Sequence, residues 1–249
     1  MMMSDPSAVE FVESRAQPAT GPPMQRAVIG SGHYLGEEFR FLASKVAGLG
    51  TARFTTIGVV SAAPEEGKTT IAIGLAAALA RSSPHRVLLL EADLRQPAVE
   101  RYLGLPRVSG VAEWLSGRSS AVPVRTIAPP GFSVIAAGRE RLARPELLAS
   151  PGMATLIGAC QLSFGFVIVD CPPLDPVADA VAIQDLLDGF LLVVRARRSP
   201  REAIERAVGR LKEHRIHGIV FNDQPPILPR AYGYRQTRAH ERYAGGAKR

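Results

Sequence analysis

Residues 54–80 constrain the fold of this chain more than any other stretch. A mostly apolar run ends at Val60, the loop SAAPEEGKTT follows as residues 61–70, and an apolar, Ala-rich segment continues to Ala80. The run before the loop predicts a buried strand, and the segment after it predicts a buried helix. A loop that ends in Gly-Lys-Thr between a strand and a helix is typical of a phosphate-binding P-loop.

This loop predicts a nucleotide site built largely from main-chain atoms. Backbone N–H groups of such a turn point at the β-phosphate, the lysine ammonium binds β and γ oxygens, and the threonine hydroxyl binds Mg²⁺. Ala62 replaces the first glycine of the motif, which is tolerable if its φ angle is not positive. Because the backbone does the binding, we expect the side chains of Glu65 and Glu66 to point outward. The predicted nucleotide-binding residues of the loop are Ala62, Ala63, Pro64, Glu65, Glu66, Gly67, Lys68, Thr69 and Thr70.

Short β-rich runs alternate with longer helical segments along the rest of the chain. The predicted strands are 54–60, 86–91, 132–136, 165–170, 189–195 and 216–222. The predicted helices are 37–46, 68–81, 97–103, 145–162 with a break at Pro151, 176–187 and 200–214. Several of the strands are continuously apolar, which is typical of parallel strands buried on both faces. The pattern predicts an α/β fold with a doubly wound, mostly parallel sheet of the P-loop NTPase (MinD/ParA-like) type.

The two ends of the chain differ from this alternating region. Residues 1–33 mix Pro, Ser, Gly and scattered charges without periodicity, so we expect them to be disordered. Residues 34–223 form the predicted domain. Residues 224–249 hold six Lys or Arg and one Glu, and the whole chain has a net charge of +7. Charge alone leaves this predicted flexible tail open to nucleic acid, anionic lipid, an acidic protein or solvent.

Composition narrows the class of protein further. No apolar run has the roughly 18 to 20 residues of a membrane span, and the first residues lack the features of a signal peptide. Cys160 and Cys171 have neither a metal-ligand spacing nor a disulfide pattern, so structural thiols are expected. We therefore expect a cytoplasmic protein.

Acidic residues follow two of the predicted strands. Glu91 and Asp93 come at the end of one, and Asp170 ends another. Carboxyl ends of parallel strands meet at one edge of the sheet, where ligands bind in such folds. Asp170 suits the Walker B role of holding Mg²⁺ through its water shell, and Asp93 either does the same or positions a nucleophile. Because Glu91 and Asp93 are two apart on an extended chain, we expect a pair that orients metal and accepts a proton.

Together these segments resemble the bacterial tyrosine kinases (BY-kinases) of capsular and exopolysaccharide synthesis, over residues 34–223. The resemblance rests on the loop 61–70, a second Walker motif at 88–97, a Walker B motif at 167–173, the segment 144–150, Asp179-Ala180 and the strand 191–195. No single piece is specific, but their combination is.

The resemblance implies ATP- and Mg²⁺-dependent autophosphorylation of C-terminal tyrosines, in trans, within a ring of protomers. It also implies an activator, the cytoplasmic segment of a membrane polysaccharide co-polymerase, and hence a location at the inner face of the plasma membrane. Nucleic acid is not an expected partner. The implied catalytic residues are Lys68, Glu91, Asp93 and Arg95, and the implied metal site is Thr69, Asp93 and Asp170. Arg195 and Asn222 are implied in nucleotide binding, Glu37 and Arg40 in oligomerisation, and Tyr232, Tyr234 and Tyr243 as phosphoacceptors.

The chain departs from the family pattern at two named positions. Glu91 stands where the family usually has Asp, and the extra methylene moves the carboxylate by about 1 Å, which lowers the rate if that group acts as a base. In the helix that forms the ring, Glu37 and Arg40 are followed by Ala43 where a second Arg is usual. The tyrosine cluster is also sparse.

Two other functions compete with a kinase. A ParA/MinD-like partitioning ATPase needs a signature lysine near the start of the loop, and Ala63 stands there. A nucleotide-binding scaffold of the polysaccharide machinery would explain the departures at Glu91 and Ala43.

Overall fold

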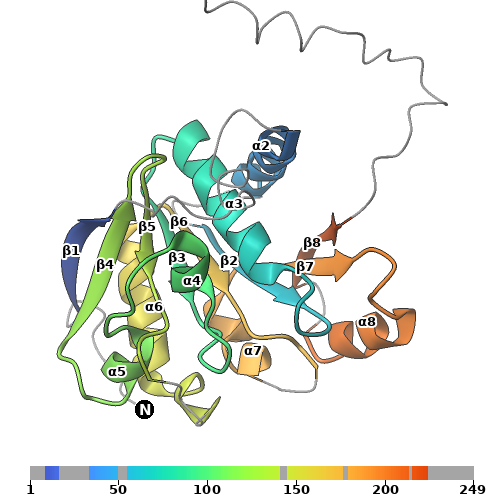
Figure 1. The fold of residues 1–249 in the computed structure, drawn as a ribbon. Helices are drawn as coiled ribbons and strands as arrows, with labels where there is room; N and C mark the ends of the chain where they lie inside the picture. The colour runs from blue at the N-terminus through green and yellow to red at the C-terminus, as the bar shows by residue number, and fades with distance from the viewer. Residues whose placement is uncertain are drawn as a thin grey trace, which may run out of the picture.

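A computed structural model describes residues 9–16, 34–49, 55–140, 145–175, 179–212 and 215–223. These residues form an eight-stranded sheet in the order β1-β4-β5-β3-β6-β2-β7-β8, with helices on both faces (Figure 1). The strands are β1 Glu10–Ala16, β2 Thr55–Ser61, β3 Val87–Glu91, β4 Ala121–Ile127, β5 Phe132–Ile135, β6 Phe166–Asp170, β7 Gly189–Arg195 and β8 Ile216–Asn222. Neighbouring strands pair in parallel except β4 with β5, so the predicted doubly wound, mostly parallel sheet is confirmed.

The sheet divides the apolar core into two halves, and helices cover each half. The helices are α2 Tyr34–Ala47, α3 Lys68–Ser82, α4 Val99–Leu103, α5 Val111–Leu115, α6 Pro151–Ser163, α7 Asp179–Ala182 and α8 Arg201–Val208, with 3₁₀ turns η2 Pro145–Leu147 and η3 Gln184–Leu186. Side chains of α2, α3 and α4 pack on one face of the sheet, and those of α5 to α8 pack on the other.

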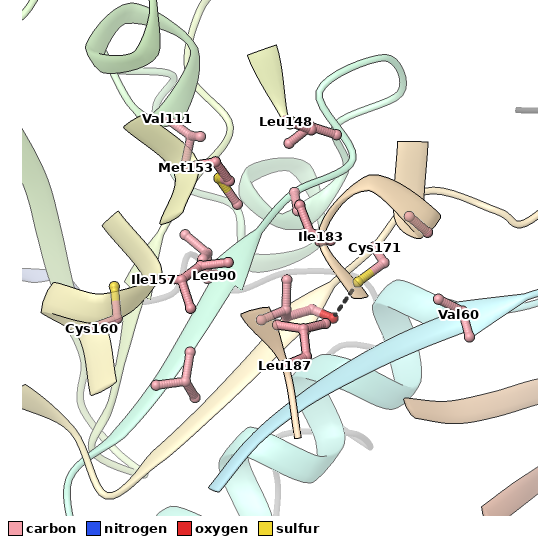
Figure 2. Packing of buried hydrophobic residues seen from close by; sticks show 14 of the residues in the cluster. Val60, Leu90, Val111, Leu148, Met153, Ile157, Cys160, Cys171, Ile183 and Leu187 are labelled. Atoms are coloured by element: carbon pink, nitrogen blue, oxygen red, sulfur yellow. Dashed lines mark hydrogen bonds between the residues drawn. The ribbon is translucent and has the colours of Figure 1, made fainter. Parts of the chain in front are cut away.

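The central strands are buried on both faces. Every residue of β2, β3 and β6 is buried, which explains why β3 and β6 are apolar up to their final acidic residue rather than alternating. Figure 2 shows part of the second core half, where Met153 and Ile157 of α6 lie near Leu90 of β3. In the same region the Cys171 thiol donates to the Val169 carbonyl at 3.4 Å. Cys160 and Cys171 are buried free thiols, as a structural role requires.

Helix α2 packs directly on α3 (Figure 1). A Cβ atom at Gly74 of α3 would lie 2.2 Å from the Phe39 ring, so only glycine lets the ring come this close. Ala43 is fully buried in this core half. The longer side chain of an arginine would not fit at position 43, because the packed interior has few voids.

The expectation of disorder for residues 1–33 is wrong at β1. Residues 10–16 pair in parallel with β4 from Glu10–Ala121 to Ala16–Ile127. Neither β4 nor α5 was predicted. Strand β1 forms because β4 offers it an edge to pair with, and the local sequence pattern of residues 10–16 does not encode that partner.

The six predicted strands are present within one residue of their predicted bounds, and the break at Pro151 is confirmed. Pro151 begins α6, where its missing N–H costs nothing. Three predicted helices are shorter: 97–103 begins at Val99, 176–187 divides into α7 and η3, and 200–214 ends as α8 at Val208. Within the described ranges, no helix combines the length and apolarity that crossing a membrane requires.

Candidate nucleotide-binding and phosphotransfer site

The P-loop lies between β2 and α3, beside the ends of β3 and β6. Strand β6 pairs with both β2 and β3, so the loops that follow these three strands meet at one edge of the sheet. A cleft of about 590 Å³ opens there. Its lining residues are Pro64, Glu65, Gly67, Lys68, Thr69, Asp93, Gln96, Pro97, Ala98, Arg101, Tyr102, Pro173 and Arg195.

The main chain of the P-loop has the conformation that the sequence predicts. Ala62 is buried, and the described non-glycine residues with positive φ are Glu65 and two outside the loop, so alanine is tolerated at 62. Gly67 has a φ of 99°, and a Cβ atom there would lie 2.1 Å from the Asn222 side-chain nitrogen. Glycine is therefore required at 67 both for its backbone angle and for this close approach.

The prediction that both glutamates of the loop point outward is wrong for Glu66. Glu65 is exposed, but the Glu66 side chain is buried inside the loop. One carboxylate oxygen accepts a hydrogen bond from the Ala63 N–H at 3.1 Å, and the other accepts one from the Ser199 hydroxyl. Main-chain donors inside a tight loop need acceptors, and Glu66 supplies one to its own loop. This carboxylate therefore braces the loop instead of facing the phosphates.

Arg195 and Asn222 support the P-loop from the ends of β7 and β8. Arg195 donates to the Glu65 carbonyl at 3.1 Å and also lines the cleft. Asn222 donates to the Glu66 carbonyl at 2.9 Å. Both side chains therefore hold loop backbone, and Arg195 also forms part of the cleft surface.

Thr69 and Asp170 form the centre of the site. The Thr69 hydroxyl donates to Asp170 Oδ2 at 2.7 Å, and Lys68 lines the cleft beside them. Asp170 is 1% exposed, and its Oδ1 has no hydrogen-bond partner among the described residues. Burial, and to a lesser extent the neighbouring Glu91, raise the pKa of the Asp170 carboxyl to about 8, although Thr69 and Lys68 oppose the shift. A buried carboxyl perturbed in this way marks a functional site.

The arrangement around Asp170 fits Mg²⁺. Its unpartnered oxygen and the Thr69 hydroxyl are hard oxygen ligands, which this ion prefers. In the part of the chain that the structure describes, no group of three or more His, Cys, Asp or Glu could hold a metal ion. Mg²⁺ usually keeps several waters and is bound by one or two carboxylates together with substrate phosphates.

The expected pairing of Glu91 with Asp93 is wrong. Glu91 Oε1 accepts backbone N–H bonds from Ala98 at 2.5 Å and Val99 at 2.8 Å, and Oε2 accepts one from Ala137 at 2.9 Å. Glu91 is 1% exposed and does not line the cleft, whereas Asp93 does. Burial raises the pKa of Glu91, and the three backbone donors oppose that rise. These three backbone hydrogen bonds give Glu91 a structural role.

Arg95 is also directed away from the cleft. Its Nε donates to Asp179 Oδ2 at 2.5 Å, and a terminal nitrogen lies 3.4 Å from Oδ1. Asp179 begins α7 and its side chain is 7% exposed, whereas that of Arg95 is 39% exposed. The hydrogen bond to Asp179 raises the Arg95 pKa. Arg95 is therefore held at α7 and is absent from the cleft lining.

Sequence reasoning assigned no role to one stretch of the lining, residues 96–98 with Arg101 and Tyr102, because only Gln96 and Pro97 belong to a motif, the second Walker motif at 88–97. Glu37 and Arg40 form an ion pair with each other on the exposed surface of α2. The predicted phosphoacceptors lie outside the described residues: Tyr232, Tyr234 and Tyr243.

Comparison with known proteins gives close relatives. No family model matches the chain. The succinoglycan biosynthesis transport protein ExoP of Rhizobium meliloti is 37% identical over 67% of this chain and 22% of its own length. The tyrosine-protein kinase YwqD of Bacillus subtilis is 30% identical over 74% of this chain and 78% of its own length. The solved kinase domain of the Escherichia coli tyrosine kinase ETK aligns with a TM-score of 0.71 at 26% identity, covering 81% of this chain and 82% of that domain. The chain spans about a quarter of the length of several curated relatives.

Proposed function

The chain belongs to the bacterial tyrosine-protein kinase family, and we propose that it is an ATP-dependent autokinase that phosphorylates tyrosine. One observation carries the proposal. The P-loop, Thr69 with Asp170, and the cleft-lining Asp93 lie together at one edge of the sheet, as phosphoryl transfer requires. Relatives named tyrosine-protein kinases support the acceptor class.

Several residues in and beside the cleft have a part in this reaction. The P-loop backbone and Lys68 bind the phosphates, and Thr69, Asp170 and Asp93 would hold Mg²⁺, which supplies charge neutralisation when bound. The phenol oxygen of tyrosine forms a bond to the γ-phosphorus as the bond between that phosphorus and ADP breaks. We assign acceptance of the phenol proton to Asp93, whose side chain lines the cleft. Arg95 contributes indirectly, by fixing the segment after Asp93 to α7.

We place the acceptors and partners as follows. Tyr232, Tyr234 and Tyr243 accept phosphate in trans from a neighbouring protomer, and Glu37 with Arg40 contributes to protomer contacts. The activator is the cytoplasmic segment of a membrane polysaccharide co-polymerase, which holds the kinase at the inner face of the plasma membrane. The name of the ExoP relative supports a role in exopolysaccharide synthesis.

Phosphotyrosine mapping tests this proposal. The purified chain is incubated with Mg²⁺ and ATP, with and without the activator segment, and its phosphopeptides are identified by mass spectrometry. We expect phosphate on residues 224–249 that increases when the activator is present. The triple Tyr→Phe variant at Tyr232, Tyr234 and Tyr243 removes most of it, and persistent phosphotyrosine in that variant would place the acceptor elsewhere.

A nucleotide-binding scaffold remains the second candidate, and two observations favour it. Glu91 is engaged by backbone amides and Arg95 by Asp179, so two residues of the implied catalytic set do not face the cleft. ATP binding without tyrosine phosphorylation, in the presence of the activator segment, would establish the scaffold and exclude the kinase.

A further inference from the structure

Nucleotide binding does not account for the whole cleft. Beyond the P-loop and Asp93, its lining includes five residues from the loop after β3 and from α4: Gln96, Pro97, Ala98, Arg101 and Tyr102. We name this stretch the α4 wall. Gln96 and Pro97 end the second Walker motif at 88–97, but Ala98, Arg101 and Tyr102 lie outside any phosphate-binding motif, so this side of the cleft is available to a second ligand.

The strand order places the α4 wall on a particular side of the P-loop. The order β3-β6-β2-β7-β8 puts Asp170, at the end of β6, between the P-loop and the loop after β3. Arg195 and Asn222, at the ends of β7 and β8, lie on the other flank. A metal-binding acid belongs beside the β- and γ-phosphates, so a bound ATP would have its γ-phosphate toward Asp170 and Asp93 and its nucleoside toward Arg195. The α4 wall would therefore lie next to the γ-phosphate, which is the phosphate that is transferred.

Two carboxylates, those of Glu91 and Asp93, accept hydrogen bonds from the backbone of the wall and hold it in place. Glu91 accepts the N–H groups of Ala98 and Val99, and Asp93 Oδ1 accepts the N–H of Gln96 at 3.0 Å. Val99 is fully buried under the wall. A surface held in this way binds a ligand without having to be ordered first, which lowers the entropy cost of binding.

A buried ion pair ties the wall to the sheet. Glu100 of α4 pairs with Arg125 of β4 at 2.7 Å, and their side chains are 6% and 7% exposed. The same Glu100 oxygen accepts the N–H of Val108 at 3.3 Å. The orientation of α4, and with it the side chains that α4 presents to the cleft, is therefore set by the sheet.

The exposed chemistry of the wall suits an aromatic ligand. Tyr102 is half-buried, and the exposed Arg101 guanidinium lies 5.9 Å from the centre of its ring. Pro97 adds a flat apolar surface to the same lining. A tyrosine ring, a planar cation and a proline ring are the surfaces on which a further aromatic ring packs.

We propose that the α4 wall is the acceptor subsite: it binds the phenol ring of a tyrosine-bearing peptide segment beside the γ-phosphate. The ring packs against Tyr102 and Pro97, with the Arg101 guanidinium over it. This inference rests on the proposed kinase function and names the part of the cleft that recognises the substrate.

A binding assay without phosphate transfer tests the subsite. A fluorescein-labelled peptide of residues 230–245 is titrated by anisotropy with the full chain, Mg²⁺ and a non-hydrolysable ATP analogue. Tyr232, Tyr234 and Tyr243 of the chain are replaced by Ala, so that its tail offers no competing phenol ring. Affinity for the analogue is measured on the same samples.

Tyr102→Ala is expected to weaken peptide binding at least tenfold and Arg101→Ala at least threefold, with less than a twofold change in affinity for the ATP analogue. Tyr102→Phe keeps the ring and should bind as the parent does. Arg118→Ala removes an exposed arginine outside the cleft lining and should change neither affinity. Unchanged peptide binding in Tyr102→Ala, or an equal loss of analogue binding, overturns the subsite. Because nothing is transferred here, that failure is distinct from a lack of kinase activity, which appears as absent phosphotyrosine.

Discussion

The Thr69 hydroxyl donates a 2.7 Å hydrogen bond to Asp170 and so joins the first turn of α3 to the end of β6. The other Asp170 oxygen is buried without a hydrogen-bond partner among the described residues. A buried carboxylate oxygen left in this state costs free energy unless a cation or a proton occupies it. The relationship between these two residues therefore connects the stability of the metal-free chain to its use of Mg²⁺.

Asp170→Asn tests this connection. The amide oxygen keeps the bond from Thr69 and the volume is unchanged, but the negative charge that attracts Mg²⁺ is lost. We expect Mg²⁺-dependent ATP binding, measured by calorimetry, to weaken at least tenfold. An unchanged dependence on Mg²⁺ concentration would remove Asp170 from the metal site.

The pH dependence of the unfolding free energy provides a second test of the same Asp170→Asn variant. Burial raises the pKa of Asp170 from its ordinary 3.8 to about 8 in the folded chain. Between these values the folded state binds more protons than the unfolded state, so the parent loses stability as pH rises from about 4 to about 8. Asparagine has no such proton. In EDTA, urea unfolding should show the variant gaining stability over the parent between pH 5 and pH 8, and an equal difference at both pH values contradicts the account.

Gly67→Ala should disable the P-loop. A left-handed backbone costs alanine about 1 kcal/mol or more, and its Cβ atom would also lie 2.1 Å from the Asn222 side chain. We expect ATP affinity to fall at least tenfold and stability to fall beyond the backbone cost. Gly117→Ala is the matched control, because Gly117 has a φ of 72° and nothing lies within 4 Å of its added Cβ. Equal losses of stability in the two variants would show that the Asn222 contact is unimportant.

Glu66→Gln and Glu65→Gln should differ although the residues are neighbours. Gln at 66 places an N–H₂ group against one of two donors, the Ala63 amide or the Ser199 hydroxyl, and a mismatched buried donor costs about 1–3 kcal/mol. ATP affinity should therefore fall about fivefold or more for Glu66→Gln. Among the described residues the exposed Glu65 side chain makes no such bond, and its variant should change affinity less than twofold. Similar values for both variants would return Glu66 to the outward orientation.

Glu91→Asp separates a structural role from a catalytic base. The shorter side chain cannot keep all three amides of Ala98, Val99 and Ala137 paired, so the unfolding free energy should fall by about 1–3 kcal/mol. Amide hydrogen exchange at those three positions should accelerate. If Glu91 were instead the base, the aspartate usual in the family would preserve stability and exchange and raise the rate of phosphorylation.

The sheet could be predicted from the sequence because burial on both faces leaves a direct trace. Runs such as 87–90 and 166–169 are apolar throughout, and the P-loop marks one strand–helix junction. Strand β1 left no such trace, since its residues are mostly exposed and its existence depends on pairing with β4. The strand order, which arranges the cleft, also lies beyond local pattern.

Within the site, backbone geometry was more predictable than the direction of side chains. The positions of Lys68, Thr69 and Asp170 follow from the motif. The directions of Glu66, Glu91 and Arg95 do not, because each is set by partners distant in sequence: Ser199, Ala137 and Asp179. Alternation along an extended chain placed Glu91 beside Asp93, but the demand of buried amides for acceptors decided its orientation.

The central claim, tyrosine phosphorylation by this cleft, is tested most directly by transfer from γ-labelled ATP. The parent and Lys68→Met are incubated with Mg²⁺ and the activator segment, and phosphoamino acids are separated. We expect label on tyrosine in the parent and a loss of at least about a hundredfold in the variant, since the lysine supplies charge to the transferred phosphate. Circular dichroism should show the same fold in both. Equal labelling of parent and variant, or ATP binding by the parent without any phosphotyrosine, would contradict it.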